Sequence, residues 1–189
     1  VEVGSVRGRY SIIGLKPDLV WRCRDTRAEI NRDPLRAPLA FVLEPQPALQ
    51  SLAALIEASK LEIPAPLPPM AAGLFGYLAY DSVRLVERIP DKNPDALGIP
   101  DAMFLRPSVI AVFDGVEDAV SIVTPVRPQA GVSAEEAYAA ADARIAEIAD
   151  ELEKPLPPRK RAEKVAPGAP QSNFSPDSFK RMIAKAKDY

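Results

Sequence analysis

The sequence predicts an α+β fold in which a mostly antiparallel sheet packs against helices. Short segments that alternate apolar and polar residues, typical of strands in hairpins, are interspersed with segments of helical apolar spacing. They do not follow the regular strand and helix alternation of a parallel sheet, and no internal repeat is visible. Hydrophobic residues make up 47% of the 189 residues, so we expect the chain to bury a core.

The first part of the chain predicts three short strands. Residues alternate over Val6–Ile12, and Gly14 together with Lys16–Asp18 predicts a turn that ends this strand. Two further alternating segments, Leu19–Arg24 and Arg27–Asn31, predict a hairpin. The side chains of this hairpin that we expect in the core include Trp21 and Cys23.

The next part predicts a helix between irregular segments. Leu39–Leu43 could form a short strand, and apolar residues then recur at helical spacing over Pro47–Lys60. The proline-rich Ile63–Pro69 segment predicts an extended connector, because proline cannot donate to a ladder. We expect a strand over Ala71–Tyr77 and a helix over Leu78–Arg88. The residues of this second helix expected to face the core are Val83, Leu85 and Val86.

The second half of the chain predicts a loop, a hairpin and two helices. Proline, glycine, aspartate and asparagine residues, which favour turns, recur over Ile89–Pro107 and predict a loop there. Val109–Phe113 and Ala119–Thr124 flank an Asp-Gly turn and predict a hairpin. Ser133-Ala134-Glu135-Glu136 is a capping box, which predicts the start of a helix that ends near Lys154. Ser175 and the proline after it predict the start of a final amphipathic helix.

Composition divides the chain into residues 1–154, a linker over 155–172 rich in proline, lysine and arginine, and residues 173–189. The chain starts at Val1 without methionine and ends inside an amphipathic pattern, so we expect it to be a fragment of a longer protein. The most apolar segment is much shorter than the roughly 20 residues that span a bilayer. We therefore expect no membrane association.

Residue usage excludes several chemistries. The chain has no histidine and one cysteine, which removes Ser-His-Asp and Cys-His nucleophile pairs, histidine metal sites and an intramolecular disulfide. The net charge of −2, without a long basic run, disfavours a nucleic-acid surface, where clustered cations must displace counterions from phosphates. Carboxylate, lysine or tyrosine chemistry remains, or none.

Two segments are candidate sites. Arg7, Arg9 and Ser11 share one face of the first predicted strand and could bind a carboxylate, although periodicity alone favours a solvated strand face. The glycines of Gly73–Tyr77 suggest a phosphate loop, but no Gly-Lys-Ser/Thr follows, so close backbone packing is the favoured interpretation. We expect Tyr77 and Tyr80 to be core aromatics with satisfied hydroxyls. We expect Asp81 to supply a charge at a helix start.

Motifs in a fixed order along nearly the whole chain carry a family resemblance. They are Arg7–Gly14, Ala72–Tyr77, Tyr80-Asp81, Val83-Arg84, Asp101–Pro107, Val112–Asp114, Ser172–Phe174, Phe179 and Lys185–Tyr189. Together they resemble the amino-terminal region of anthranilate synthase component I, the large chorismate-using subunit. The resemblance assigns residues 1–154 to the amino-terminal domain of that protein and residues 173–189 to the truncated start of its chorismate-binding domain.

The resemblance implies the function of a longer parent protein. Chorismate and ammonia, supplied by a glutamine amidotransferase subunit (component II), would give anthranilate and pyruvate in a cytoplasmic lyase reaction of tryptophan biosynthesis. In this family the chorismate contacts and the glutamates that bind Mg²⁺ belong to the carboxy-terminal domain. We therefore expect no catalytic, cofactor-binding or metal-ligating residue in this chain, and an inactive fragment.

The resemblance also implies an allosteric pocket for L-tryptophan, with Arg9, Tyr10 and Ser11 as its residues in this chain. Two alternatives remain open. Component I of aminodeoxychorismate synthase, in the folate pathway, shares the architecture, and the product would distinguish the two enzymes. A free-standing ligand-binding module without catalysis would be favoured if this chain were a complete gene product.

Overall fold

A computed structural model describes residues 8–92, 94–156 and 168–189. The chain forms two compact units, residues 1–154 and residues 155–189. Antiparallel strands and helices alternate irregularly along the first unit, which confirms the predicted α+β class.

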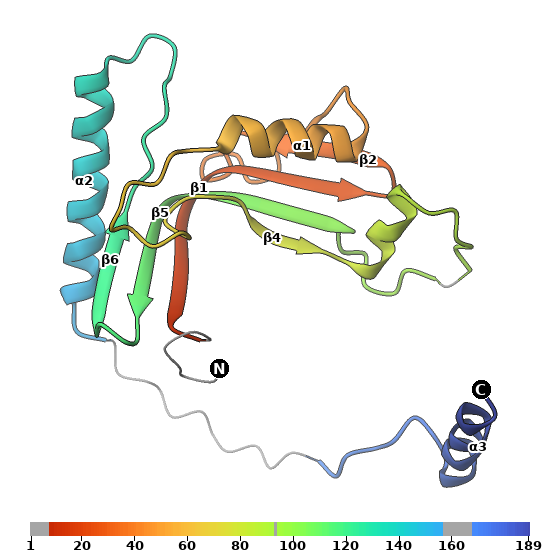
Figure 1. The fold of residues 1–189 in the computed structure, drawn as a ribbon. Helices are drawn as coiled ribbons and strands as arrows, with labels where there is room; N and C mark the ends of the chain where they lie inside the picture. The colour runs from red at the N-terminus through yellow and green to blue at the C-terminus, as the bar shows by residue number, and fades with distance from the viewer. Residues whose placement is uncertain (1–7, 93, 157–167) are drawn as a thin grey trace. The chain divides into compact units, whose positions relative to one another are not determined.

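The first unit is built on a six-stranded sheet in which every pair is antiparallel (Figure 1). Its strands are β1 (Tyr10–Arg24), β2 (Arg27–Asn31), β3 (Val42–Leu43), β4 (Phe75–Leu78), β5 (Ala102–Asp114) and β6 (Ala119–Val123). The order is β3-β2-β1-β5-β4, and β6 also pairs with β5. The first part of β5 lies between β1 and β4, and its second part lies between β1 and β6. The long pair β1 and β5 is therefore the frame of the unit.

Strand β1 continues through the predicted turn, so that prediction was wrong. Lys16 has a positive φ of 47°, and the register with β5 shifts between Pro17 and Leu19. The turn-forming residues produce a bulge, which bends a strand without ending it. Gly14 is needed beside this bulge because a Cβ there would lie 2.7 Å from Cγ of Pro107.

Strand β5 starts at Ala102, inside the segment predicted as a loop. Pro107 pairs with Pro17 next to the register shift, where the ladder is already irregular. A proline is tolerated at such a place because its missing N–H interrupts little regular pairing. The hairpin of β5 and β6 is as predicted, with β5 longer than expected.

The segment around β4 also differs from expectation. Strand β4 covers only the end of the predicted strand, and the predicted helix after it is a short 3₁₀ helix, η1 (Tyr80–Leu85). No residue of η1 is fully buried, and Val86 is exposed. Only Leu85 packs against the core as expected. A short 3₁₀ turn has poorer hydrogen-bond geometry than an α-helix and presents no continuous apolar face.

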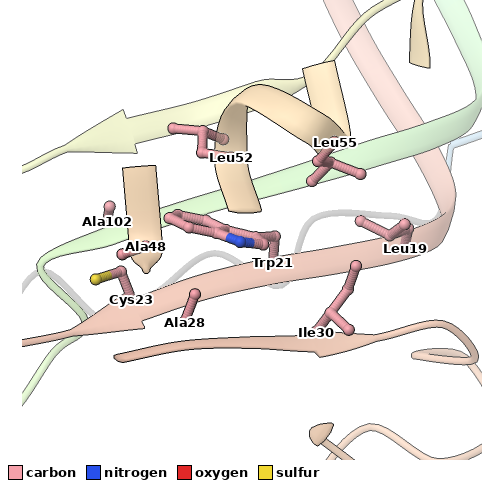
Figure 2. Packing of buried hydrophobic residues seen from close by; sticks show 9 residues of the cluster. All are labelled: Leu19, Trp21, Cys23, Ala28, Ile30, Ala48, Leu52, Leu55 and Ala102. Carbon is pink, nitrogen blue, oxygen red and sulfur yellow. The ribbon is translucent and has the colours of Figure 1, made fainter. Parts of the chain in front are cut away.

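Helix α1 (Ala48–Ser59) lies over one face of the sheet and forms the core with it (Figures 1 and 2). The clustered side chains are Leu19, Trp21, Cys23, Ala28, Ile30, Ala48, Leu52, Leu55 and Ala102. Trp21 is fully buried, and its indole N–H donates to Oγ of Ser51 at 3.0 Å. The Ser51 hydroxyl donates in turn to Glu44 at 2.9 Å. The predicted core positions of Trp21 and Cys23 are confirmed.

Helix α2 (Ala134–Glu153) lies beside β6 and buries Ala141 and Ile148. Its predicted capping box is present: Ser133 accepts from the backbone of Glu136, whose carboxylate accepts from the backbone of Ser133. This reciprocal cap satisfies two donors that a helix start otherwise leaves unpaired.

The second unit contains helix α3 (Pro176–Lys187), capped by the side chain of Ser175 as predicted. None of its residues is buried, and its large apolar side chains Phe179, Met182 and Ile183 are exposed. Most of the predicted linker, residues 157–167, lies outside the described residues. Among the described helices of both units, none is long and apolar enough to cross a membrane.

Candidate functional site

The candidate site lies where β1 begins beside the end of β5. Arg9 donates to Asp114 through Nη2, which lies 2.6 Å from Oδ2, and through Nε, which lies 2.9 Å from Oδ1. The backbone N–H groups of Val116 and Glu117 also donate to Oδ1 of Asp114. The hydrogen bonds from Arg9 and then from these amides lower the pKa of Asp114 to about 2. The carboxylate is thus fully charged at neutral pH and holds Arg9, the residue before β1, to the β5–β6 turn.

Arg9 is largely engaged by the protein itself. Its Nη2 lies 3.6 Å from Oε1 of Glu117, and its guanidinium carbon lies 5.0 Å from the centre of the Tyr10 ring. The hydrogen bond to Asp114 raises the pKa of Arg9. A ligand carboxylate would therefore have to share Arg9 with Asp114. Arg7, the other predicted arginine of this face, lies outside the described residues.

Ser11 presents its hydroxyl to the surface. It pairs in register with Phe113, and the residue before it, Tyr10, pairs with Asp114. Ser11 is exposed, and its hydroxyl makes no hydrogen bond with the described residues. The next two residues, Ile12 and Ile13, are 39% and 48% exposed. The start of β1 thus places an exposed hydroxyl beside two exposed apolar side chains.

The glycine-rich segment is packed against backbone. A Cβ at Gly76 would lie 1.9 Å from the carbonyl oxygen of Met103, so only glycine permits this pairing of β4 with β5. The Tyr77 hydroxyl donates to the carbonyl of Pro100 at 2.9 Å. Tyr77 is 39% and Tyr80 84% exposed, so the predicted core positions of both were wrong, although the hydroxyl of Tyr77 is satisfied as expected. Tyr80 starts the short η1 helix, which buries no side chain.

Several polar partners in this unit were not found from the sequence. Asp114 is 105 residues from Arg9, and Asp18 is 88 residues from Arg106, with which it forms a two-bond ion pair. Local patterns predicted the hairpins, but none indicates that β1 pairs with β5. The one available signal was the Asp-Gly turn after β5, which often places a carboxylate at a turn.

A metal centre has no geometric support in the described part of the chain. Residues 8–92, 94–156 and 168–189 contain no group of three or more Cys, Asp or Glu side chains arranged to hold an ion.

Comparison with known proteins identifies a family. The family of chorismate binding enzymes matches residues 13–189. Anthranilate synthase component 1 of Cereibacter sphaeroides is 48% identical over the whole chain, and that of Thermus thermophilus is 35% identical. The chain spans 38% and 37% of the length of these relatives.

A solved structure shares the fold. Anthranilate synthase component I from Streptococcus pneumoniae superposes with a TM-score of 0.71 at 22% identity, over the whole of this chain and 39% of that one. The family resemblance seen in the sequence is confirmed by the family match and the curated relatives, and this structural match shows that the fold is shared. This chain belongs to the family of chorismate binding enzymes, and the relatives it resembles there include anthranilate synthase component 1 proteins.

Proposed function

We propose that this chain is the amino-terminal regulatory and structural part of an anthranilate synthase component I. The observation that carries the proposal is 48% identity to such a protein over the whole chain, with little more than a third of that protein covered. The longer protein would convert chorismate and ammonia, or glutamine, into anthranilate and pyruvate in the cytoplasm. A glutamine amidotransferase subunit, component II, would supply the ammonia.

The catalytic groups would lie outside this chain. The residues present do not fit a magnesium site, because the described part lacks a suitable carboxylate cluster. Mg²⁺ and chorismate would thus be held by the remainder of the longer protein, and this chain would act as a supporting domain.

Comparing the 189-residue chain with the longer protein tests this division. Each is incubated with chorismate, ammonia and Mg²⁺, and anthranilate is followed by its fluorescence. We expect turnover by the longer protein alone. Turnover by the 189-residue chain would overturn the division, and formation of aminodeoxychorismate by the longer protein would reassign it to folate synthesis.

We further propose that Arg9, Tyr10 and Ser11 contribute to a pocket where L-tryptophan inhibits the longer protein. The exposed hydroxyl of Ser11 and the fixed position of Arg9 support this assignment. Arg9 would act mainly by holding the start of β1, because Asp114 already occupies its guanidinium.

Inhibition curves of the longer protein test this pocket. Replacing Ser11 by leucine should raise the tryptophan concentration for half inhibition about tenfold or more, because a lost hydrogen bond and a bulkier side chain both oppose binding. The matched control is Thr26→Leu, an exposed hydroxyl residue in the β1–β2 turn. Unchanged inhibition in Ser11→Leu would exclude Ser11 from the pocket.

A further inference from the structure

A pocket lined by charged residues lies in the first unit between the β1 bulge and helix α2. It has a volume of about 150 Å³, well above the roughly 10–15 Å³ that one water requires. Three elements form it: the bulge of β1 with the adjoining part of β5, the loop from β6 to α2, and the first half of α2. Its polar lining residues are Asp18, Ser108, Arg127, Gln129, Glu136 and Arg144.

Arg127 is the least satisfied cation of this pocket. Its Nε is buried and has no hydrogen-bond partner among the described residues. Its Nη2 makes one long hydrogen bond, 3.4 Å to the carbonyl oxygen of Ser59. Burial, and then the neighbouring guanidinium of Arg106, lowers the pKa of Arg127. A desolvated guanidinium with an unused donor is costly unless an acceptor completes it.

The two carboxylates that line the pocket are already engaged elsewhere. Asp18 accepts from Nε of Arg106 at 2.7 Å and from its Nη2 at 3.1 Å. Glu136 accepts from the backbone and the hydroxyl of Ser133 in the capping box. Neither accepts a hydrogen bond from Arg127 in the described part of the chain.

The charge balance of the pocket favours an anion. The charged groups that line it are the guanidiniums of Arg127 and Arg144 and the carboxylates of Asp18 and Glu136. Arg106, outside the lining, already neutralises Asp18 through its two-bond ion pair, so the group as a whole carries one positive charge in excess. Arg144 donates from Nε to the Thr124 hydroxyl at 3.2 Å, which fixes its position from α2. Arginine presents several donors in a planar fork that matches the oxygens of a carboxylate or phosphate.

We propose that this pocket binds a compact oxyanion, the carboxylate or phosphate group of a small molecule, with Arg127 as its main ligand. The volume is about ten times that needed by one water, so it admits such a group together with part of the molecule that carries it. Gln129 and Ser108 supply uncharged polar groups at the same wall. The site is distinct from the candidate site at Arg9, because the two share no residue.

Titration of the intact protein with sodium phosphate, and separately with sodium acetate, tests the proposal. Ionic strength is held constant with chloride, and thermal unfolding is followed. We expect the preferred anion to raise the melting temperature by about 3–6 °C when it reaches ten times its Kd. The anion that raises the melting temperature at the lower concentration shows whether the pocket prefers a phosphate or a carboxylate group.

Two variants locate the effect. Arg127→Gln should abolish the shift, whereas Arg36→Gln, which removes the same charge from an exposed loop residue outside the pocket, should keep it. If Arg127→Gln does not fold, Arg144→Gln should weaken binding at least about tenfold, as expected for a lost charge-assisted hydrogen bond. The absence of a shift with either anion, or equal shifts with and without Arg127, would overturn the proposal.

Discussion

The two halves of β1 differ in how they are covered, although they belong to one continuous strand. At its far half, the consecutive residues Val20 and Trp21 are 6% and 0% exposed, so both faces of the strand are packed. At its near half, Ile12 and Ile13 remain substantially exposed on both faces. The bulge between Pro17 and Leu19 separates the halves. Alternation thus predicts which side chains share a face, while burial depends on the layer that packs against that face.

The halves are also held by different forces. The far half is stabilised by apolar burial under α1, which is non-directional and tolerant of salt. The start of the near half is held by the ion pair of Arg9 with Asp114, which is directional and depends on pH. Mutation of a core side chain should therefore destabilise the far half most, whereas acid should weaken the ion pair at the start of the near half.

The largest expected effect is in the far half. Trp21→Ala would leave a cavity between α1 and the sheet and remove the bond to Ser51, so it should lower the free energy of unfolding by about 3–5 kcal/mol. Urea denaturation measures the loss. Trp21→Phe is the control that retains a ring and should cost less. Equal losses in both variants would show that the indole N–H, and not ring packing, stabilises this half.

The second effect concerns acid. Asp114 has a pKa of about 2 in the folded protein, below its usual 3.8. A lowered pKa means that the ion pair stabilises the fold above about pH 4, and that this stability is lost as the pH falls towards 2. Asp114→Asn should therefore lose stability at pH 7 and show a flatter dependence between pH 4 and pH 2.

Thermal unfolding across that pH range provides the measurement for Asp114→Asn. Asp142→Asn, on an exposed position of α2, is its control and should keep the wild-type profile. An unchanged slope in Asp114→Asn would show that the pair with Arg9 is not formed in solution.

The smallest effect is in the exposed part of the near half. Ile13→Ser should change the free energy of unfolding of the 189-residue chain by no more than about 0.5 kcal/mol, because the side chain is half-exposed already. A clearly larger loss in the longer protein, measured in the same way, would show that another layer covers this half there. Equal small effects in both would show that it stays open.

Much of the first unit could be predicted from local sequence. The capping box at Ser133 starts α2, helical spacing locates α1, and alternation places Trp21 and Cys23 inside. These features depend on residues only a few positions apart, so a short stretch of sequence is enough to predict them. The amphipathic pattern after Ser175 likewise sufficed for α3.

Only the tertiary structure decided how the strands continue and which charges meet. Gly14 and Lys16–Asp18 have turn-forming chemistry, yet pairing with β5 converts the turn into a bulge because a long ladder satisfies more backbone groups than a turn would. The partners of Arg9 and Arg106 lie 105 and 88 residues away. Such pairs arise from strand order, which a local pattern does not encode, whereas helix caps and core-facing alternation follow directly from neighbouring residues.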